Sequence, residues 1–158
     1  VWMSYAESRF MLAEAALRNW TTGSVEQYYI DGIRASMDYY NIDEAKKQAY
    51  IDGLKNKQDV SGSDKEKALK EIITQKWIAM YPLGQEAWSE FRRTGYPKIY
   101  EIVNNESGGV ISSSVQIRRV PFPYSEYQGN KEEVEKAVKL LGGPDTGATR
   151  LWWDVENK

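Results

Sequence analysis

Carboxylates are the side chains of this sequence that could perform acid–base chemistry. The 158 residues include neither His nor Cys, which excludes thiol nucleophiles, Ser-His-Asp triads and zinc sites of the usual kind. Glycoside hydrolysis would need two acids about 5 to 10 Å apart, one with a raised pKa. Glu7 and Glu14 share a helix face two turns apart, at about 10 Å of rise. Neither lies next to an aromatic pocket that would raise its pKa, so we expect no catalytic residue and no enzymatic activity.

The charge balance argues against polyanionic partners. The chain has 21 Lys and Arg against 23 Asp and Glu, a formal net charge of −2, which is no electrostatic footprint for nucleic acid or an anionic membrane. A polar run around Asn104, Asn105 and Glu106 lacks the ligand spacing of a calcium loop, and we interpret it as a solvated turn. We therefore expect no metal site, no cofactor and no nucleic acid partner.

Aromatic rings are the second group of chemistry-bearing side chains, with six Trp and eleven Tyr. They are densest between Gln75 and Pro97, QKWIAMYPLGQEAWSEFRRTGYP. Such rings could stack on sugars, but their helical spacing favours places in the core. The residues concerned are Trp77, Trp88, Phe91 and Tyr96. The same argument makes Trp152 and Trp153 a predicted carboxy-terminal clasp that docks on the body of the protein.

Three further aromatic residues lie at predicted helix ends, close to loops. Binding residues concentrate in loops. Trp20, Tyr39 and Tyr40 are therefore our candidate ligand-binding residues, although a structural role remains the alternative for each of them.

Two arginine pairs could bind phosphate or an acidic sugar. Carboxylates near them favour structural ion pairs with bidentate geometry instead. The arginines are Arg92, Arg93, Arg118 and Arg119, and the carboxylates are Glu86, Glu90 and Asp154.

The first part of the chain, residues 1–41, predicts a helical hairpin. Ser4 with Glu7, and Ser24 with Gln27, have the spacing of capping boxes in front of two amphipathic segments. Small residues in both segments would allow the backbones to approach closely: Ala13, Ala16, Gly32 and Ala35. The hairpin has the length of one tetratricopeptide unit, and no second copy is detectable.

The remaining patterns predict a mostly α-helical single domain over residues 1–158, in which 63–158 form a helical scaffold with an extended segment and the terminal clasp. We expect two strands as a small irregular hairpin, because the helical period is lost between Lys98 and Pro123. The expected helices run from Asp43 to Leu54, from a Ser63 and Glu66 capping box to Met80, from Gln85 to Arg93, and onward from Asn130. The expected strands are Ile99–Val103 and Val115–Val120.

Several runs resemble one family when they are taken together in this order. They are MSYAESRFMLAEAALRNW, DGIRASMDYY, IITQKWIAMYPLGQEAWSEFRRTGYP, RRVPFPYSEYQGN and TRLWWD. The chain is similar to the carboxy-terminal part of the SusD/RagB family of nutrient-binding outer-membrane lipoproteins of Bacteroidetes. The resemblance covers nearly the whole chain and is weakest between Asn41 and Gly62.

The resemblance implies a helical protein with tetratricopeptide-like helix pairs, located at the cell surface through a lipid anchor upstream of this chain. It also implies that the protein is the lid of a SusC-like TonB-dependent transporter and captures oligosaccharides without being an enzyme. The alternative is a peptide-capturing RagB-like protein or a protein-interaction module. The matching motifs are scaffold motifs, so the family places no ligand-contacting residue here.

Overall fold

A computed structural model of the chain describes residues 3–55 and 58–154. Within these ranges the chain forms seven α-helices and no β-strand. It divides into two compact units, Val1–Pro97 and Lys98–Lys158, which we describe separately. None of the helices is long and apolar enough to cross a bilayer, as far as the described residues go. The expected mostly helical class is confirmed, whereas a single domain over 1–158 stays a prediction.

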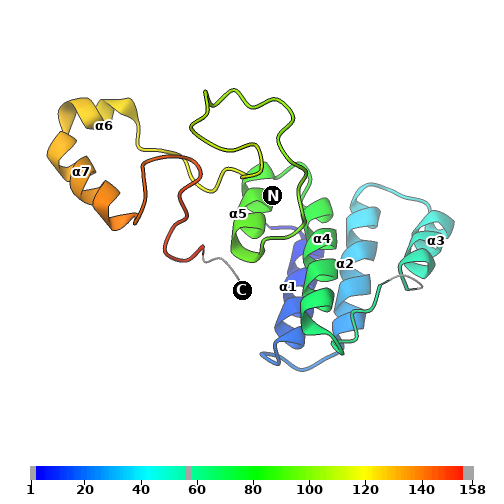
Figure 1. Cartoon of the computed structure of the whole chain (residues 1–158). Helices are drawn as coiled ribbons and strands as arrows, with labels where there is room; N and C mark the ends of the chain where they lie inside the picture. Colours follow the sequence, from blue (N-terminus) through cyan, green and yellow to red (C-terminus); the bar gives the residue numbers. More distant parts are fainter. Residues whose placement is uncertain (1–2, 56–57, 155–158) are drawn as a thin grey trace. The chain divides into compact units, whose positions relative to one another are not determined.

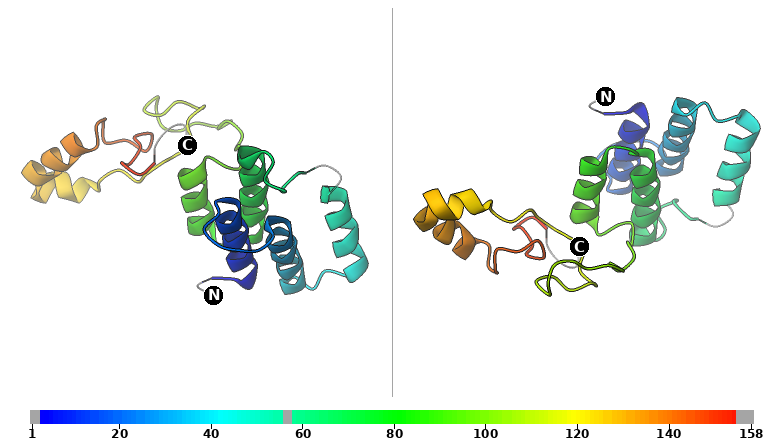
Figure 2. Two further views of the ribbon diagram at one scale, coloured as in Figure 1. Left: turned by 90° about the horizontal axis from the view of Figure 1, so that it is seen from below. Right: turned by 90° about the horizontal axis from the view of Figure 1, so that it is seen from above.

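The first unit holds five helices. α1, α2 and α4 lie side by side, α3 stands on the outer side of α2, and α5 lies at the other edge of the unit, next to α4 (Figures 1 and 2). Their bounds are α1 Tyr5–Leu17, α2 Val25–Tyr39, α3 Glu44–Lys55, α4 Lys65–Ala79 and α5 Gly84–Thr94.

The predicted caps of the hairpin are present. Ser4 Oγ accepts a 3.0 Å hydrogen bond from the Glu7 amide, and Ser24 Oγ accepts one of 3.2 Å from the Gln27 amide. Each hydroxyl satisfies an amide that has no partner within the helix. The helix starts predicted from these serines are therefore confirmed.

The core of the first unit is built around Phe10, which is almost completely buried. Its ring meets the edge of the Tyr29 ring at 6.1 Å between centroids. It also lies against Gly32, where an added Cβ would come within 2.9 Å of ring atoms. Gly32 thus allows the close approach of α1 and α2 that its small size predicts. The other buried members of this core are Ala6, Ala13, Leu17, Ile33, Ile51, Val60, Ala68, Ile72 and Ile73.

The start of α4 differs by one residue from the prediction. Asp64, not Ser63, is the N-cap residue, and its carboxylate accepts a 3.0 Å hydrogen bond from the Lys67 amide. A carboxylate at this position also interacts favourably with the helix dipole. Ser63 instead donates its hydroxyl hydrogen to Asp59, at 2.7 Å, within the preceding loop.

The aromatic segment from Gln75 to Pro97 is only partly core, so the prediction is wrong in part. Phe91 is buried, Trp88 and Tyr96 are half-buried, and Trp77 is 38% exposed. Arg92 stacks on Trp88 at 3.6 Å from the ring centroid. The Tyr96 hydroxyl donates a 2.5 Å hydrogen bond to Glu66, and this bond, together with burial, raises the pKa of Tyr96 to about 12.

The second unit contains two short helices, α6 Tyr124–Gly129 and α7 Lys131–Leu140, which follow each other directly (Figure 1). The expected strands Ile99–Val103 and Val115–Val120 are wrong, since both segments are irregular. A backbone bond from the Ile102 amide reaches only the Ser113 carbonyl, at 3.0 Å, in the loop just before the second segment.

The loop between those segments explains the missing ladder. The side-chain amide of Asn105 donates a 2.7 Å hydrogen bond to the Ile111 carbonyl. The Ser107 hydroxyl donates to the same carbonyl and accepts from the Ile111 backbone amide. Asn and Ser side chains that bond nearby backbone groups compete with strand pairing.

Two buried arginines organise the second unit. Arg118 Nε donates a 2.7 Å hydrogen bond to Asp154, which is almost fully buried, so the predicted Arg118–Asp154 ion pair is confirmed. Arg119 pairs with Asp145 in the same way. The expected docking of Trp152 is wrong, because its side chain is 89% exposed, while Trp153 is half-buried. A polar residue, Asp154, holds the tail in place of the Trp pair.

Candidate functional site

The ends of three helical segments form a groove of about 300 Å³ in the first unit. The start of α1, the end of α2 and the turn between α4 and α5 contribute its walls. Four exposed tyrosines and small side chains make up most of the surface. The tyrosines are Tyr5, Tyr39, Tyr40 and Tyr81, and the small residues are Ser4, Ala6, Ala35, Ser36 and Ala79, with Pro82 and Leu83 at one side. We call this feature the tyrosine groove.

The end of α2 fixes Tyr39 and Tyr40 at the rim. Asn41 has a φ of 54°, in the left-handed region. Its amide bonds the Asp38 carbonyl, and the Ile42 amide bonds the Met37 carbonyl, both at 3.0 Å. These two bonds form a Schellman motif, which ends a helix sharply and satisfies its last carbonyls. The chain reverses there, so Tyr39, the last residue of α2, and Tyr40, its C-cap residue, lie at the end of the helix.

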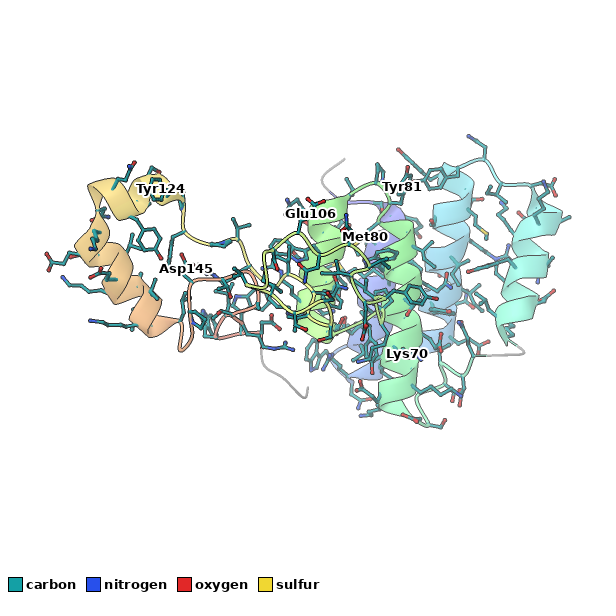
Figure 3. All side chains as sticks on the ribbon, turned by 45° about the horizontal axis from the view of Figure 1, so that its top comes forward. Lys70, Met80, Tyr81, Glu106, Tyr124 and Asp145 are labelled. Carbon is teal, nitrogen blue, oxygen red and sulfur yellow. The ribbon has the colours of Figure 1, made fainter. Side chains whose placement is uncertain are left out.

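The rings of Tyr39 and Tyr40 contact each other, and Tyr40 is bound to the backbone of Tyr81. The Tyr40 hydroxyl donates a 2.6 Å hydrogen bond to the Tyr81 backbone carbonyl. The Tyr39 and Tyr40 rings meet edge to face, with 5.1 Å between centroids and 89° between planes. Tyr81 lies just beyond the end of α4 (Figure 3). The groove is thus preorganised by contacts among its own walls.

Tyr5 completes the rim from the first turn of α1. The Arg9 guanidinium lies 4.6 Å from the centroid of its ring, in cation–π contact. Sequence reasoning missed Tyr5 and assigned Tyr81 to the dense aromatic segment. Both lie at helix ends, next to Ser4 and Pro82 respectively, so the criterion that selected Tyr39 and Tyr40 would also have selected them.

Trp20, the third predicted candidate, is not part of the tyrosine groove. It follows the other end of α1, where Asn19 has a φ of 60° and the Trp20 amide bonds the Ala15 carbonyl at 2.8 Å. Its ring is exposed, and the Arg18 guanidinium lies 5.3 Å from its centroid. The structure therefore brings together Tyr39 and Tyr40 but places Trp20 at separate pockets.

The composition of the groove defines what it can bind. None of its described lining residues carries a charge, which favours a neutral ligand. Tyr rings provide flat apolar faces and hydroxyl groups at low conformational cost. Among the described residues no group of three or more Asp or Glu is arranged to hold a metal ion.

Glu14, one of the two carboxylates considered as glycosidase acids, has a lowered pKa. Burial alone would raise the pKa of Glu14, but hydrogen bonds and charge from Arg93 and Arg18 outweigh it and lower the pKa below its ordinary value. A general acid needs the opposite shift. The lowered pKa of Glu14 therefore does not suit it to be the general acid of a glycosidase.

Comparison with known proteins decides the family. A family model described as SusD-like, the SusD and RagB outer membrane lipoproteins, matches residues 1–65 and 56–154. The chain belongs to the SusD/RagB family. Members of this family are outer membrane lipoproteins without catalytic activity, so the expected family and location are confirmed.

Solved SusD homologues have the same fold. The chain is 39% identical to a chitin-binding SusD homologue from Flavobacterium johnsoniae, with a TM-score of 0.80. The match covers 96% of the present chain and 36% of the homologue. A SusD homologue from Bacteroides ovatus is 38% identical, with a TM-score of 0.83, over 96% and 37% of the two chains. One from Bacteroides thetaiotaomicron is 31% identical, with a TM-score of 0.84, over 99% and 39%.

The chain spans somewhat more than a third of the length of these SusD homologues. No curated protein sequence matches it. The family relationship therefore rests on the family model and on the solved structures.

Proposed function

We propose that this SusD-like chain belongs to a cell-surface protein that captures neutral oligosaccharides, and that the tyrosine groove contacts the sugar. The observation that carries the proposal is the set of four exposed tyrosines around an uncharged groove. Sugar rings have apolar C–H faces that stack on flat aromatic rings, while their hydroxyls accept and donate hydrogen bonds. The phenol groups and Ser36 offer matching partners.

The ligand class that we favour is an oligosaccharide of N-acetylglucosamine. Support comes from the Flavobacterium johnsoniae relative, which is described as chitin-binding. The acetamido group of such a sugar is neutral, with an apolar methyl, and suits a groove without charge. We further propose that the protein delivers the sugar to a SusC-like TonB-dependent transporter, and that the α1–α2 hairpin is a tetratricopeptide-like unit of the scaffold.

Calorimetric titration with chitin oligosaccharides tests the role of the groove. Tyr39→Ala and Tyr81→Ala should each weaken binding about tenfold, which corresponds to ~1.4 kcal/mol. Tyr124→Ala is the matched control, because Tyr124 is 76% exposed, close to the 74% of Tyr81, but belongs to the second unit. It should bind like the wild type.

Two results would contradict the proposal. Unchanged affinity in both groove variants would remove the tyrosine groove from the binding site. Binding of a peptide mixture, with no response to any oligosaccharide, would replace the sugar by a peptide ligand.

A further inference from the structure

A second pocket of the first unit, about 410 Å³ in volume, carries an unbalanced charge. It is formed by α1, α4, α5 and Trp20, apart from the tyrosine groove, and no residue lines both. Four carboxylates face two cations in it. The carboxylates are Glu7, Glu14, Glu86 and Glu90, and the cations are Lys76 and Arg93. We call it the acidic pocket.

Both cations of the acidic pocket are committed to two of the carboxylates. Lys76 Nζ lies 2.6 Å from Glu90 Oε2, and both side chains are buried. Arg93 binds Glu14 in a bidentate manner, with Nη1–Oε1 at 2.8 Å and Nη2–Oε2 at 2.5 Å, and also bonds Glu90. The Arg93–Glu90 ion pair was predicted from the sequence and is confirmed.

Glu7 is the unbalanced group. It is only 6% exposed, and its Oε2 atom is buried without a hydrogen-bond partner among the described residues. A buried carboxylate without a partner carries a large desolvation cost, which a cation at hydrogen-bond distance would offset. Glu86 is exposed to solvent and does not share this situation.

Two side chains further along the acidic pocket suit a cation with an apolar stem: Met11, one turn after Glu7 on α1, and Trp20, which follows the other end of that helix. Trp20 and Met11 line the same pocket and are both largely exposed. An indole face attracts cations, and a thioether adapts to apolar groups. Carboxylates beside an aromatic ring form a typical site for ammonium and guanidinium groups.

We propose that the acidic pocket binds an organic cation, an alkylammonium or alkylguanidinium group, whose charged head pairs with Glu7 and whose stem runs along Met11 toward Trp20. A free amine and a Lys or Arg side chain of a peptide share this chemistry. The site acts independently of oligosaccharide binding in the tyrosine groove.

The test is an NMR titration of the 158-residue chain with butylguanidinium, following the methyl resonance of Met11, which lines the pocket and is present in every variant. Saturable shifts are expected with butylguanidinium and none with butylurea, its neutral counterpart of the same shape. A short peptide with one Arg, compared with the same peptide containing citrulline, distinguishes a side chain from a free amine as the source of the cation.

Three variants locate the charge that matters. Glu7→Gln should weaken butylguanidinium binding at least tenfold while leaving unfolding cooperative and the unliganded protein no less stable, because the buried charge is gone. Glu86→Gln removes the same charge from the rim of the pocket and should change affinity by at most twofold. Trp20→Ala alters an exposed ring without threatening the fold and should weaken binding at least threefold.

The proposal is overturned if butylurea binds as well as butylguanidinium, or if Glu7→Gln and Glu86→Gln weaken binding equally. Should Glu7→Gln fail to fold, unchanged affinity in Trp20→Ala overturns it instead.

Discussion

The Tyr40 hydroxyl donates a 2.6 Å hydrogen bond to the backbone carbonyl of Tyr81, 41 residues further along the chain. The bond connects the end of α2 to the turn between α4 and α5. It also sets the distance between two walls of the tyrosine groove. One contact thus serves both the packing of the first unit and the shape of its candidate site.

Tyr40→Phe should lower the free energy of unfolding by about 0.5–1.5 kcal/mol, the usual value of a single hydrogen bond. Tyr39→Phe is the control, because no hydrogen bond of the Tyr39 hydroxyl is found among the described residues; it should stay within about 0.5 kcal/mol of the wild type. Urea denaturation measures both. Equal stability of the two variants would show that the bond contributes nothing.

Gly32→Ala should destabilise the protein by about 1–3 kcal/mol. The new methyl would come within 2.9 Å of the buried Phe10 ring, and overpacking of this kind outweighs the better helix propensity of Ala. At Gly53, within α3, an added Cβ meets nothing within 4 Å. Gly53→Ala should therefore stabilise the protein by about 0.5–1 kcal/mol. Thermal unfolding that shifts both variants in the same direction would refute this account of the α1–α2 contact.

Asp154→Asn should cost about 3–5 kcal/mol, because it removes the charge that Arg118 needs in a buried position. Arg150 contacts the same carboxylate at 2.9 Å. Glu132→Gln is the control: the Glu132 side chain pairs with Lys136 but is 84% exposed. This substitution should change the free energy of unfolding by less than about 1 kcal/mol. The two variants are compared by urea unfolding followed through Trp fluorescence, for which Trp152 and Trp153 are the reporters in the second unit. A cost below 1 kcal/mol for Asp154→Asn would contradict the assigned role.

The stability of the first unit should fall at acid pH partly through Glu14. Its pKa is lowered in the folded state, whereas an unfolded Glu titrates near about 4.3. The stabilisation is therefore present above the pKa of the unfolded state and is lost as the pH falls through the pKa of the folded state. Glu14→Gln should show a shallower loss of stability between pH 5 and pH 3 in urea titrations. A slope as steep as that of the wild type would contradict it.

The helices of the first unit could be predicted because their signals are local. Ser4 and Ser24 cap α1 and α2 as expected, and α3, α4 and α5 were predicted close to their observed bounds. The left-handed conformations of Asn19 and Asn41, which close these two helices, were not predicted, although Asn is the second choice after Gly for such a position.

The predictions of side-chain burial and of strand pairing failed where tertiary contacts determine the outcome. Whether a ring in an amphipathic helix is buried depends on how much of that face a neighbouring helix covers, and α4 leaves Trp77 partly uncovered. In the second unit, Asn105 and Ser107 bond the backbone in place of a strand partner, and Asp154 takes the buried position expected for Trp152. Of the candidate site, Tyr39 and Tyr40 came from the sequence, but their meeting with Tyr5 and Tyr81 depends on the packing of α1, α2 and α4.

Both α1 and α2 are closed at their ends by their own backbone, through Asn19 and Asn41. The aromatic side chains beside these closures are consequently not required to end the helices. Exchange of Trp20 or Tyr39 for another ring should leave the architecture intact. The ligand specificity of such a scaffold can therefore change through a few rim residues while the fold is kept.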